Sequence, residues 1–183
     1  ALEMAETQRQ ASAILAEPRL LDSRVRSVLA SMRRHDQLGQ AHLLLRLLRQ
    51  ADTTASLREY NLFLAAVKRC VVMGRADASN GVCLNLMLCV LRELQRLGPL
   101  PDCVTYNTVI SACKLQANLP LAFELLGEMD QQQISPSVIT FTTILDGCAQ
   151  ASELQASAVL LERMSLRGVE PNEWTCSAIA KLA

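Results

Sequence analysis

Apolar residues recur with helical spacing along most of the chain, and between residues 101 and 172 the pattern repeats itself. Four of them lie at i, i+3, i+4 and i+7, which places them on one face of a helix. A polar break at 116–118 separates this stripe from a second one. The first stripe consists of Tyr106, Val109, Ile110 and Cys113, and the second of Ala122, Phe123, Leu125, Leu126 and Met129. The pattern predicts two helices joined by a short turn.

The same two stripes return 35 residues later. Their members are Phe141, Ile144, Leu145 and Cys148 in the first stripe and Leu160, Leu161 and Met164 in the second. Ser152 and Gln155 have the spacing of a capping box, which predicts the start of the second helix. Pro101, Pro136 and Pro171 close successive units, because proline lacks an N–H and pushes the preceding residue toward extended geometry. Each unit is predicted to run helix, turn, helix, extended connector.

One such hairpin cannot bury its apolar faces alone, so neighbouring units are expected to stack. The predicted fold class is all-α: an α-solenoid of helix-turn-helix repeats with a 35-residue period, whose first helices line one surface. Residues 1–21 are expected to form a leading helix or cap. The solenoid is predicted to comprise a degenerate unit 22–56, then units 57–102, 103–137 and 138–172, and a partial unit 173–183.

Unit 57–102 has 46 residues, and aligning its two ends with the other units places the surplus between its helices, around 72–81. Loop-forming residues are frequent there, and an apolar run at 82–89 follows. Two interpretations stay open. The tip is a protein-docking element, because insertions in repeats are extruded on one face. Alternatively, the extra residues lengthen the second helix and pack on the neighbouring unit.

The repeat is specific enough to indicate a family. The strings PDCVTYNTVISAC, GEMDQQQISPS, VITFTTILDGC and ERMSLRGVEPN resemble the pentatricopeptide repeat. That repeat begins with Val-Thr-Tyr-Asn, carries a Met near the end of its second helix and closes with Pro-Asp or Pro-Asn. The tetratricopeptide repeat has a period of about 34 residues and a Trp-Leu-Gly-Tyr pattern that this sequence lacks. The resemblance implies binding of single-stranded RNA, one base per unit, in transcript processing, stability or translation.

The resemblance also implies which residues read the bases. In this family they are the fifth and the last residue of each unit, and the second residue packs on the base faces. The reading pairs carried over are Asn61 with Asp102, Asn107 with Ser137, and Thr142 with Asn172, while Ser177 has no partner in the sequence. The stacking positions are Arg58, Val104, Ile139 and Trp174. The three pairs imply a preference for 5'-UCA-3', and unit 22–56, with Arg26 and Ser56, is assigned no base.

The residue types alone leave a structural interpretation open. Asn or Thr in the first turn of a helix is often a capping residue, and Asp or Asn after proline is ordinary turn chemistry. The recurrence of the pairs at the same repeat positions is what favours base reading.

The balance of charge argues against RNA as the sole partner. Lys+Arg and Asp+Glu are 18 each, whereas phosphate contacts normally supply much of the affinity for nucleic acids. The two best-formed units, 103–137 and 138–172, are acidic. A second class of function therefore stays open: a non-catalytic scaffold subunit of a large organellar assembly, such as a ribosome or a respiratory or photosynthetic complex, whose solenoid contacts protein.

The residues do not form a catalytic, metal-binding or cofactor pattern. His35 and His42 lack ligand or nucleophile spacing, and a glycine-rich phosphate loop is absent from the sequence. We therefore expect no enzyme activity, no metal, no cofactor and no small-molecule substrate. The seven cysteines lie on apolar stripes without CxxC spacing, so they are expected to be buried free thiols.

The chain is expected to be soluble, because its apolar runs are far shorter than a membrane span. Glu3, Glu6 and Glu17 are unlike an acid-poor transit peptide. The family resemblance implies a location in the mitochondrion or chloroplast. We therefore expect any targeting sequence to lie upstream of Ala1.

Overall fold

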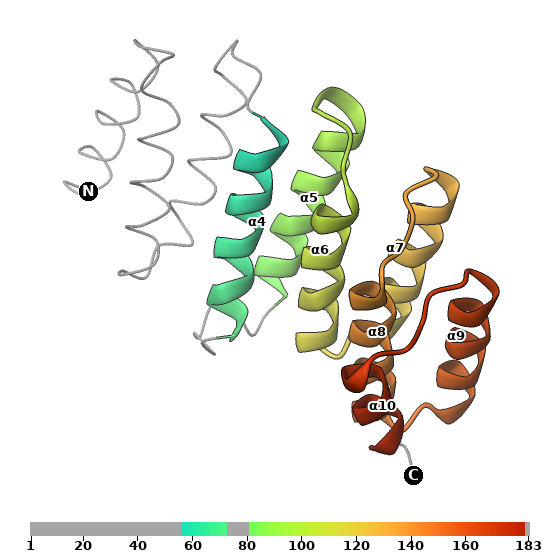
Figure 1. Cartoon of the computed structure of the whole chain (residues 1–183). Coiled ribbons are helices and arrows are strands. Elements are labelled where there is room, and N and C mark those ends of the chain that lie inside the picture. The colour runs from blue at the N-terminus through green and yellow to red at the C-terminus, as the bar shows by residue number, and fades with distance from the viewer. Residues whose placement is uncertain (1–55, 73–80, 182–183) are drawn as a thin grey trace, which may run out of the picture.

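A computed structural model of the protein describes residues 56–72 and 81–181. Within these two ranges the chain forms seven helices and no strand, which confirms the all-α prediction (Figure 1). The helices are α4 (Leu57–Val72), α5 (Val82–Leu97), α6 (Cys103–Leu115), α7 (Leu119–Gln131), α8 (Val138–Ala151), α9 (Leu154–Leu166) and α10 (Glu173–Ala180). The helices expected in 1–21 and in unit 22–56 lie outside the described residues.

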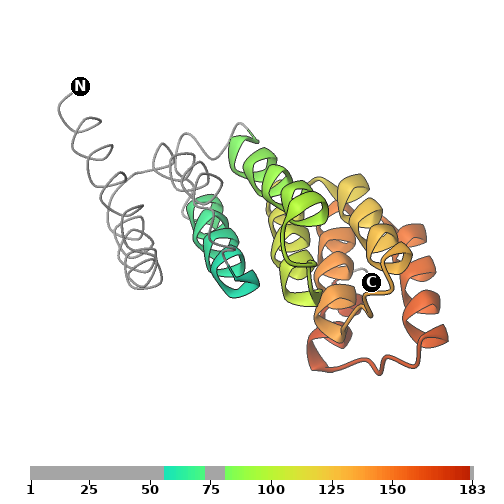
Figure 2. The ribbon, with the colours of Figure 1, turned by 90° about the horizontal axis from the view of Figure 1, so that it is seen from above.

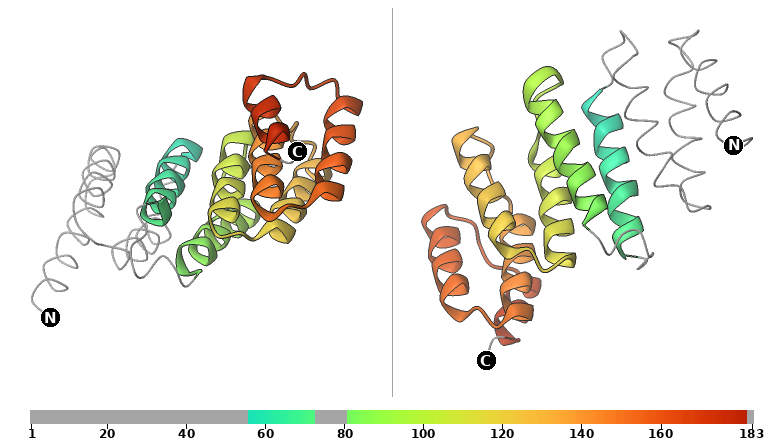
Figure 3. Two further views of the ribbon diagram at one scale, coloured as in Figure 1. Left: turned by 90° about the horizontal axis from the view of Figure 1, so that it is seen from below. Right: turned by 180° about the vertical axis from the view of Figure 1, so that it is seen from behind.

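The helices form two layers, as expected of a solenoid. The first helices of the units, α4, α6, α8 and α10, pack side by side in what we call the first-helix layer. Helix α5 contacts α4 and α6, α7 contacts α6 and α8, and α9 contacts α8. Seen from above, α5, α7 and α9 lie on one side of the first-helix layer (Figure 2). The views from below and behind show the same succession of helices (Figure 3). We call the side of the first-helix layer that α5, α7 and α9 do not cover the first-helix face.

The apolar stripes predicted from the sequence form the core. The four members of the stripe in α6 and their four counterparts in α8 are fully buried. Met129 in α7 and Met164 in α9 are buried at matching positions. The hydroxyl of Tyr106 is satisfied within this core, because Gln95 of α5 donates a hydrogen bond to it at 2.9 Å. The apolar side chains of each unit are therefore enclosed by its own hairpin and by its neighbours.

Helices α6 to α9 end in a left-handed turn that also repeats every 35 residues. Ala117 and Ser152 follow first helices with φ of 52° and 57°, and Gln133 and Gly168 follow second helices with φ of 58° and 66°. At each turn the next N–H donates to the carbonyl five positions earlier. This is the Schellman motif, which satisfies carbonyl groups that the end of a helix leaves unpaired.

The capping box predicted at Ser152 and Gln155 is wrong. Ser152 occupies the left-handed position at the end of α8, and α9 begins after Glu153 without a side-chain cap. The Schellman turn thus uses the serine that would otherwise cap α9. Capping boxes lie instead at the starts of first helices, where the last residue of each unit accepts from the backbone N–H three positions on. These capping residues are Asp102, Ser137 and Asn172.

The surplus residues of unit 57–102 are not confined to its tip. Helices α4 and α5 have 16 residues each, whereas α6 and α7 have 13. Residues 73–80 of the tip lie outside the described residues. In the apolar run that follows, Cys83, Leu84, Leu86 and Met87 are buried. This packing favours the second interpretation, because buried side chains cannot contact a docking partner.

The prediction of buried thiols is correct for only part of the cysteines. Cys83, Cys113 and Cys148 are buried, Cys103 is partly exposed, and Cys89 and Cys176 are exposed. Burial raises the pKa of the Cys113 thiol to about 12, so this thiol stays protonated at neutral pH. The prediction is wrong for the exposed pair because the apolar stripe in the sequence is wider than the surface that neighbouring helices cover.

Candidate nucleic-acid interface

The fifth residue of α4 and the last residue of its unit lie side by side at the boundary with the next unit. Asn61 Nδ2 donates to Asp102 Oδ1 at 3.2 Å, although the two residues are 41 positions apart. Asp102 is held there because it caps the start of α6 by accepting from the Thr105 backbone N–H at 2.8 Å. The Thr105 hydroxyl donates to Asn61 Oδ1 at 2.7 Å. Helix capping in one unit thus places the capping side chain beside the fifth residue of the preceding first helix.

The carboxyl group of Asp102 is ionised at neutral pH. Burial acts to raise its pKa, but hydrogen bonds from Thr105 and Asn61 outweigh burial and lower the pKa below its ordinary value. In the described structure the Thr105 backbone N–H, the Thr105 hydroxyl and the Asn61 amide all donate to Oδ1. Oδ2 is therefore left to accept a hydrogen bond from a ligand.

The next unit repeats this geometry with a hydroxyl group in place of the carboxylate. Asn107 Nδ2 donates to Ser137 Oγ at 3.3 Å, and Thr140 donates to Asn107 Oδ1 at 2.6 Å. Ser137 caps α8 by accepting from the Thr140 backbone N–H at 3.4 Å. Asn107 Nδ2 also lies 3.4 Å from Cys103 Sγ, which is a weak acceptor. This boundary presents an amide beside a hydroxyl that can both donate and accept.

The third predicted pair is joined indirectly. Among the described residues Thr142 and Asn172 share no direct hydrogen bond, and Thr175 lies between them. Thr175 Oγ1 is 2.9 Å from Thr142 Oγ1 and donates to Asn172 Oδ1 at 2.9 Å. Asn172 caps α10 by accepting from the Thr175 backbone N–H at 3.0 Å. Ser177, the fifth residue of the partial unit, is exposed on α10.

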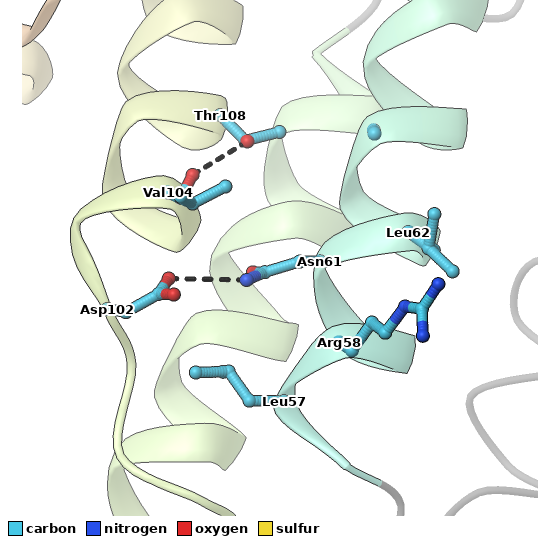
Figure 4. A pocket seen from close by; sticks show the side chains of 8 residues that line it. Leu57, Arg58, Asn61, Leu62, Asp102, Val104 and Thr108 are labelled. Atoms are coloured by element: carbon cyan, nitrogen blue, oxygen red, sulfur yellow. Dashed lines mark hydrogen bonds between the residues drawn. The ribbon is translucent and has the colours of Figure 1, made fainter.

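A pocket of about 490 Å³ opens between α4 and α6 around the first pair (Figure 4). Asn61 reaches from α4 toward Asp102 at the start of α6. Arg58 and Val104, the predicted stacking residues of successive units, belong to its two sides. Its other lining residues are Leu57, Leu62, Ala65 and Thr108. Apolar walls with an amide and a carboxylate suit a flat ring with apolar faces and a polar edge.

The predicted stacking residues are exposed. Val104, Ile139 and Trp174 have exposed fractions of 57%, 61% and 73%, and Arg58 is also exposed. Three large apolar side chains thus occupy the same position in successive units without protein covering them. Such a periodic apolar series is available for contact with a ligand.

The third residue of each unit also belongs to the site, although no role was predicted for it from the sequence. Thr105, Thr140 and Thr175 are fully buried, and each bonds to both predicted reading residues at its boundary. The only signal in the sequence is the recurrence of threonine at one repeat position. Glu59 holds this position in unit 57–102, and it accepts from the Ser56 backbone N–H at 2.6 Å.

Charge is distributed unequally between the layers. In unit 103–137 the basic Lys114 belongs to α6, whereas all three acids belong to α7, in the second-helix layer. Of these acids, Glu128 pairs with Arg92 of α5 at 3.7 Å, and Asp130 pairs with Arg163 of α9. The acidic excess of this unit therefore lies away from the first-helix layer and links neighbouring second helices.

Asp146 of α8 joins three units within the first-helix layer. Its carboxylate oxygens lie 2.8 Å from Lys114 Nζ and 2.6 Å from Lys181 Nζ. Burial acts to raise the pKa of Asp146, but the hydrogen bonds and positive charges of the two lysines outweigh burial and lower the pKa. The ionised carboxylate thus ties α6 and the end of α10 to α8.

The part of the chain that the structure describes lacks any group of three His, Cys, Asp or Glu side chains suited to hold a metal ion. Its helices are also too short or too polar to cross a membrane, as far as residues 56–72 and 81–181 are concerned. His35 and His42 lie outside the described residues. The expectation that the protein is not an enzyme stays a prediction.

Comparison with known proteins identifies the repeat. A family model for the pentatricopeptide repeat domain matches residues 89–151 and 125–183. No curated protein matches the chain. The pentatricopeptide repeat protein PPR10 from maize is 21% identical with a TM-score of 0.62, over 79% of this chain and 19% of that one. PPR10 in complex with an 18-nt psaJ RNA element is 21% identical with a TM-score of 0.59, over 86% and 22%. The PPR domain of Arabidopsis thaliana protein-only RNase P 1 in complex with tRNA is 16% identical with a TM-score of 0.69, over 89% and 78%.

At these identities the solved structures show a shared fold. The chain spans about a fifth of the length of PPR10 and more than three quarters of the RNase P 1 domain. The two family-model matches together cover residues 89–183, which is more than half of the chain. The 35-residue period and the two-layer stack agree with these matches, and the chain belongs to the pentatricopeptide repeat family.

Proposed function

We propose that the first-helix face binds single-stranded RNA, with one base read by each of the units 57–102, 103–137 and 138–172. The observation that carries the proposal is an Asn amide bonded to the capping residue at two successive boundaries, at 3.2 and 3.3 Å. Family membership supports it, as do the two similar structures that contain RNA. We further propose that this binding serves transcript processing, stability or translation in a mitochondrion or chloroplast.

Unit 57–102 is proposed to read uracil. Asn61 has a second amide hydrogen besides the one given to Asp102, and the ionised Asp102 can only accept. Uracil offers a complementary edge, because its N3–H donates while its carbonyl oxygens accept. Cytosine carries a lone pair at N3 in place of that hydrogen, and this lone pair would face a carboxylate.

Unit 103–137 is proposed to read cytosine. Ser137 is uncharged, and its hydroxyl can rotate to donate to the N3 lone pair that a carboxylate would repel. Asn107 can donate to the cytosine carbonyl, because its second amide hydrogen is held only by the weak acceptor Cys103 Sγ. The change from Asp to Ser at the last position therefore changes an acceptor into a possible donor.

Unit 138–172 is proposed to read adenine. Thr175 Oγ1 is placed to donate to Asn172 Oδ1, and when its single hydrogen is given there, the Thr142 hydroxyl donates to Thr175. Thr142 Oγ1 is then an acceptor toward a ligand, while the Asn172 amide group can donate. Adenine presents a donor at N6 beside an acceptor at N1, which complements this pair. With the orientation of the family, the three units prefer 5'-UCA-3'.

The stacking positions supply contact that does not depend on base identity. Bases have apolar faces, and stacking on an aromatic side chain contributes about 1–3 kcal/mol per base. Trp174 is suited to this because it is 73% exposed, and Val104 and Ile139 offer smaller apolar surfaces at the same position. Arg58 can combine stacking with attraction to phosphate.

Charge is a weaker objection to RNA than the composition suggests. The net negative charge of unit 103–137 comes from the acids in α7, which belong to the second-helix layer and not to the proposed RNA-binding face. Two of these acids are also paired with arginines. The scaffold function is the alternative that the experiment has to separate from RNA binding.

The test is a competition assay at low salt with short RNAs that contain 5'-UCA-3' or the same bases in scrambled order. We expect the UCA sequence to bind more tightly. A matched control is Gln132→Ala, which removes an exposed side chain from the connector after α7 and should leave binding unchanged. Equal affinity for all sequences, or no binding at low salt, would contradict the proposal. Sedimentation with a large assembly after nuclease treatment would support the scaffold function instead.

A further inference from the structure

We propose that the buried threonine at the third position of a unit determines specificity by fixing whether the reading side chain of the preceding unit donates or accepts. This inference rests on the proposed function, and it assigns positioning roles to Thr105, Thr140 and Thr175. Each of these side chains is fully buried at a unit boundary. None of them needs to touch the RNA, because each acts through the fifth residue of the preceding unit.

Helix capping accounts for only part of the contacts of these threonines. In each case Oγ1 accepts from the backbone N–H of the capping residue, at 3.3, 3.0 and 3.2 Å in chain order. A second contact crosses the unit boundary to the preceding first helix, at 2.7, 2.6 and 2.9 Å. A cap within its own helix does not require this second contact. It ties the preceding reading residue to the start of the next helix.

The position of the hydrogens fixes the two asparagines as donors. Asn61 Oδ1 and Asn107 Oδ1 carry no hydrogen, so the hydrogen in each short contact must come from the threonine. Thr105 shares its hydrogen between Asn61 Oδ1 and Asp102 Oδ1, which lies 2.8 Å away. Reversing the Asn61 amide would place its oxygen against the ionised Asp102 and its NH₂ group against Thr105, which already accepts a backbone N–H. The threonine therefore holds each amide so that N–H groups face the capping residue and the ligand.

The same position has the opposite effect at the third boundary. Either hydroxyl can donate in the 2.9 Å contact between Thr175 and Thr142, and Thr175 Oγ1 also lies 2.9 Å from Asn172 Oδ1. When Thr175 gives its single hydrogen to Asn172, it accepts from Thr142. The hydrogen of Thr142 then points into the protein, and its lone pairs remain for a ligand. One residue type at one repeat position thus makes asparagine a donor and threonine an acceptor.

The start of α4 carries a different residue at the third position of the unit. This residue is Glu59, whose carboxylate accepts from the Ser56 backbone N–H at 2.6 Å and from the Ser56 hydroxyl at 3.2 Å. An ionised carboxylate cannot donate a hydrogen bond to a reading side chain. The absence of threonine here agrees with the unit 22–56 being assigned no base.

The experiment compares Thr140→Val, Thr140→Ser and the wild type in binding RNAs of the form 5'-UNA-3', where N is each of the four bases. Valine keeps the shape but removes the hydroxyl, whereas serine keeps the hydroxyl. We expect Thr140→Val to reduce discrimination at the middle base about two- to tenfold, the range for one hydrogen bond, with Thr140→Ser close to the wild type. Discrimination at the first and third bases should not change.

Ser157→Ala is the matched control for loss of a buried hydroxyl. Ser157 donates to the Glu153 carbonyl at 2.9 Å in the second-helix layer, away from the reading residues. If Thr140→Val lowers the melting temperature as Ser157→Ala does, and weakens all four RNAs equally, the threonine has only a structural role and the proposal is overturned.

A measurement without RNA separates this inference from the proposed function. In NMR spectra of the free protein, the chemical shifts of the two Asn107 side-chain amide hydrogens should move toward those of a freely rotating asparagine side chain in Thr140→Val. In Thr140→Ser and Ser157→Ala these chemical shifts should stay in place. If the wild type shows no base preference but these resonances respond, the reading function fails while the positioning by Thr140 stands. Unchanged Asn107 resonances in Thr140→Val would overturn the positioning role itself.

Discussion

Asp102 has a structural task and a proposed recognition task at the same time. Its Oδ1 caps α6 and receives the Asn61 amide, while Oδ2 is left for a ligand. Ser137 and Asn172 cap α8 and α10 in the same way. Capping and base reading are therefore compatible explanations for these residues, because the cap fixes the side chain that is proposed to read the base.

The ionised state of Asp102 predicts a flat pH dependence for uracil recognition. Its folded pKa is lowered, so the carboxylate persists above that value and is lost only as the pH falls through it. The ratio of dissociation constants for RNAs with U or C as first base should stay constant between about pH 5 and pH 8. Asp102→Asn should reduce this ratio at every pH in the range. A wild-type ratio that varies across it would show that another group controls the preference.

The positions of the proposed reading residues could be predicted from the sequence, but the contacts that hold them could not. The pairs Asn61 with Asp102 and Asn107 with Ser137 followed from repeat position, and the structure brings both within hydrogen-bond distance. The role of Thr140 was missed, because its contact with Asn107 spans two helices whose relative placement depends on the stacking of units.

Among the helices, α7 and α8 bury their apolar stripes against neighbours, which predicts large losses on truncation. Met129→Ala and Ile144→Ala remove fully buried side chains, so each should lower the free energy of unfolding by about 2–5 kcal/mol. Urea denaturation of both variants measures this. Gln132→Ala, at an exposed position, serves as control. Losses no larger than in the control would mean that these helices do not pack as described.

Replacing Asp146 is expected to have opposite effects on stability and on RNA binding. Asp146→Asn should lower the free energy of unfolding by about 0.5–1 kcal/mol, because both ion pairs are partly exposed. The folded pKa is lowered, so this contribution is present at neutral pH and disappears as the pH falls through that pKa. The released Lys114 and Lys181 should strengthen RNA binding and steepen its salt dependence, by about 0.7 in log–log slope per lysine that reaches a phosphate.

The control for Asp146→Asn is Glu162→Gln, which removes the same charge from an exposed position on α9. Binding isotherms over a range of salt concentrations compare the two variants. If Glu162→Gln strengthens binding as much as Asp146→Asn, the effect comes from net charge and not from release of the two lysines.

The existence of the helices could be predicted from apolar spacing, but their ends could be predicted less well. The break at 116–118 was correct, since α6 ends at Leu115 and α7 begins at Leu119. The Schellman turns at Ala117, Gln133 and Ser152 carry no glycine to signal a left-handed residue. For the same reason Ser152 was interpreted as a cap. The extra residues in α4 and α5 are set by packing, which an alignment of unit ends does not reveal.

In the molecule as a whole, the two layers carry different kinds of residues. The second-helix layer carries α7 with its acids and their ion pairs to α5 and α9, whereas the first-helix layer carries the proposed reading and stacking residues and the ion pairs of Asp146. Because each boundary is built from the same three positions, a unit should be able to change its base preference without affecting its neighbours. Independent reading of one base by each unit is therefore the main expectation from this structure.

The most direct test exchanges the pair of one unit for that of another. Thr142→Asn with Asn172→Asp gives unit 138–172 the pair that Asn61 and Asp102 form, and Thr175 remains to hold the new asparagine. Competition binding with 5'-UCA-3' and 5'-UCU-3' RNAs compares the wild type with the double variant. We expect the wild type to prefer UCA, the double variant to prefer UCU, and the preferences at the first two bases to be unchanged. A double variant that still prefers A, or that loses discrimination at all three bases together, would contradict reading of one base per unit.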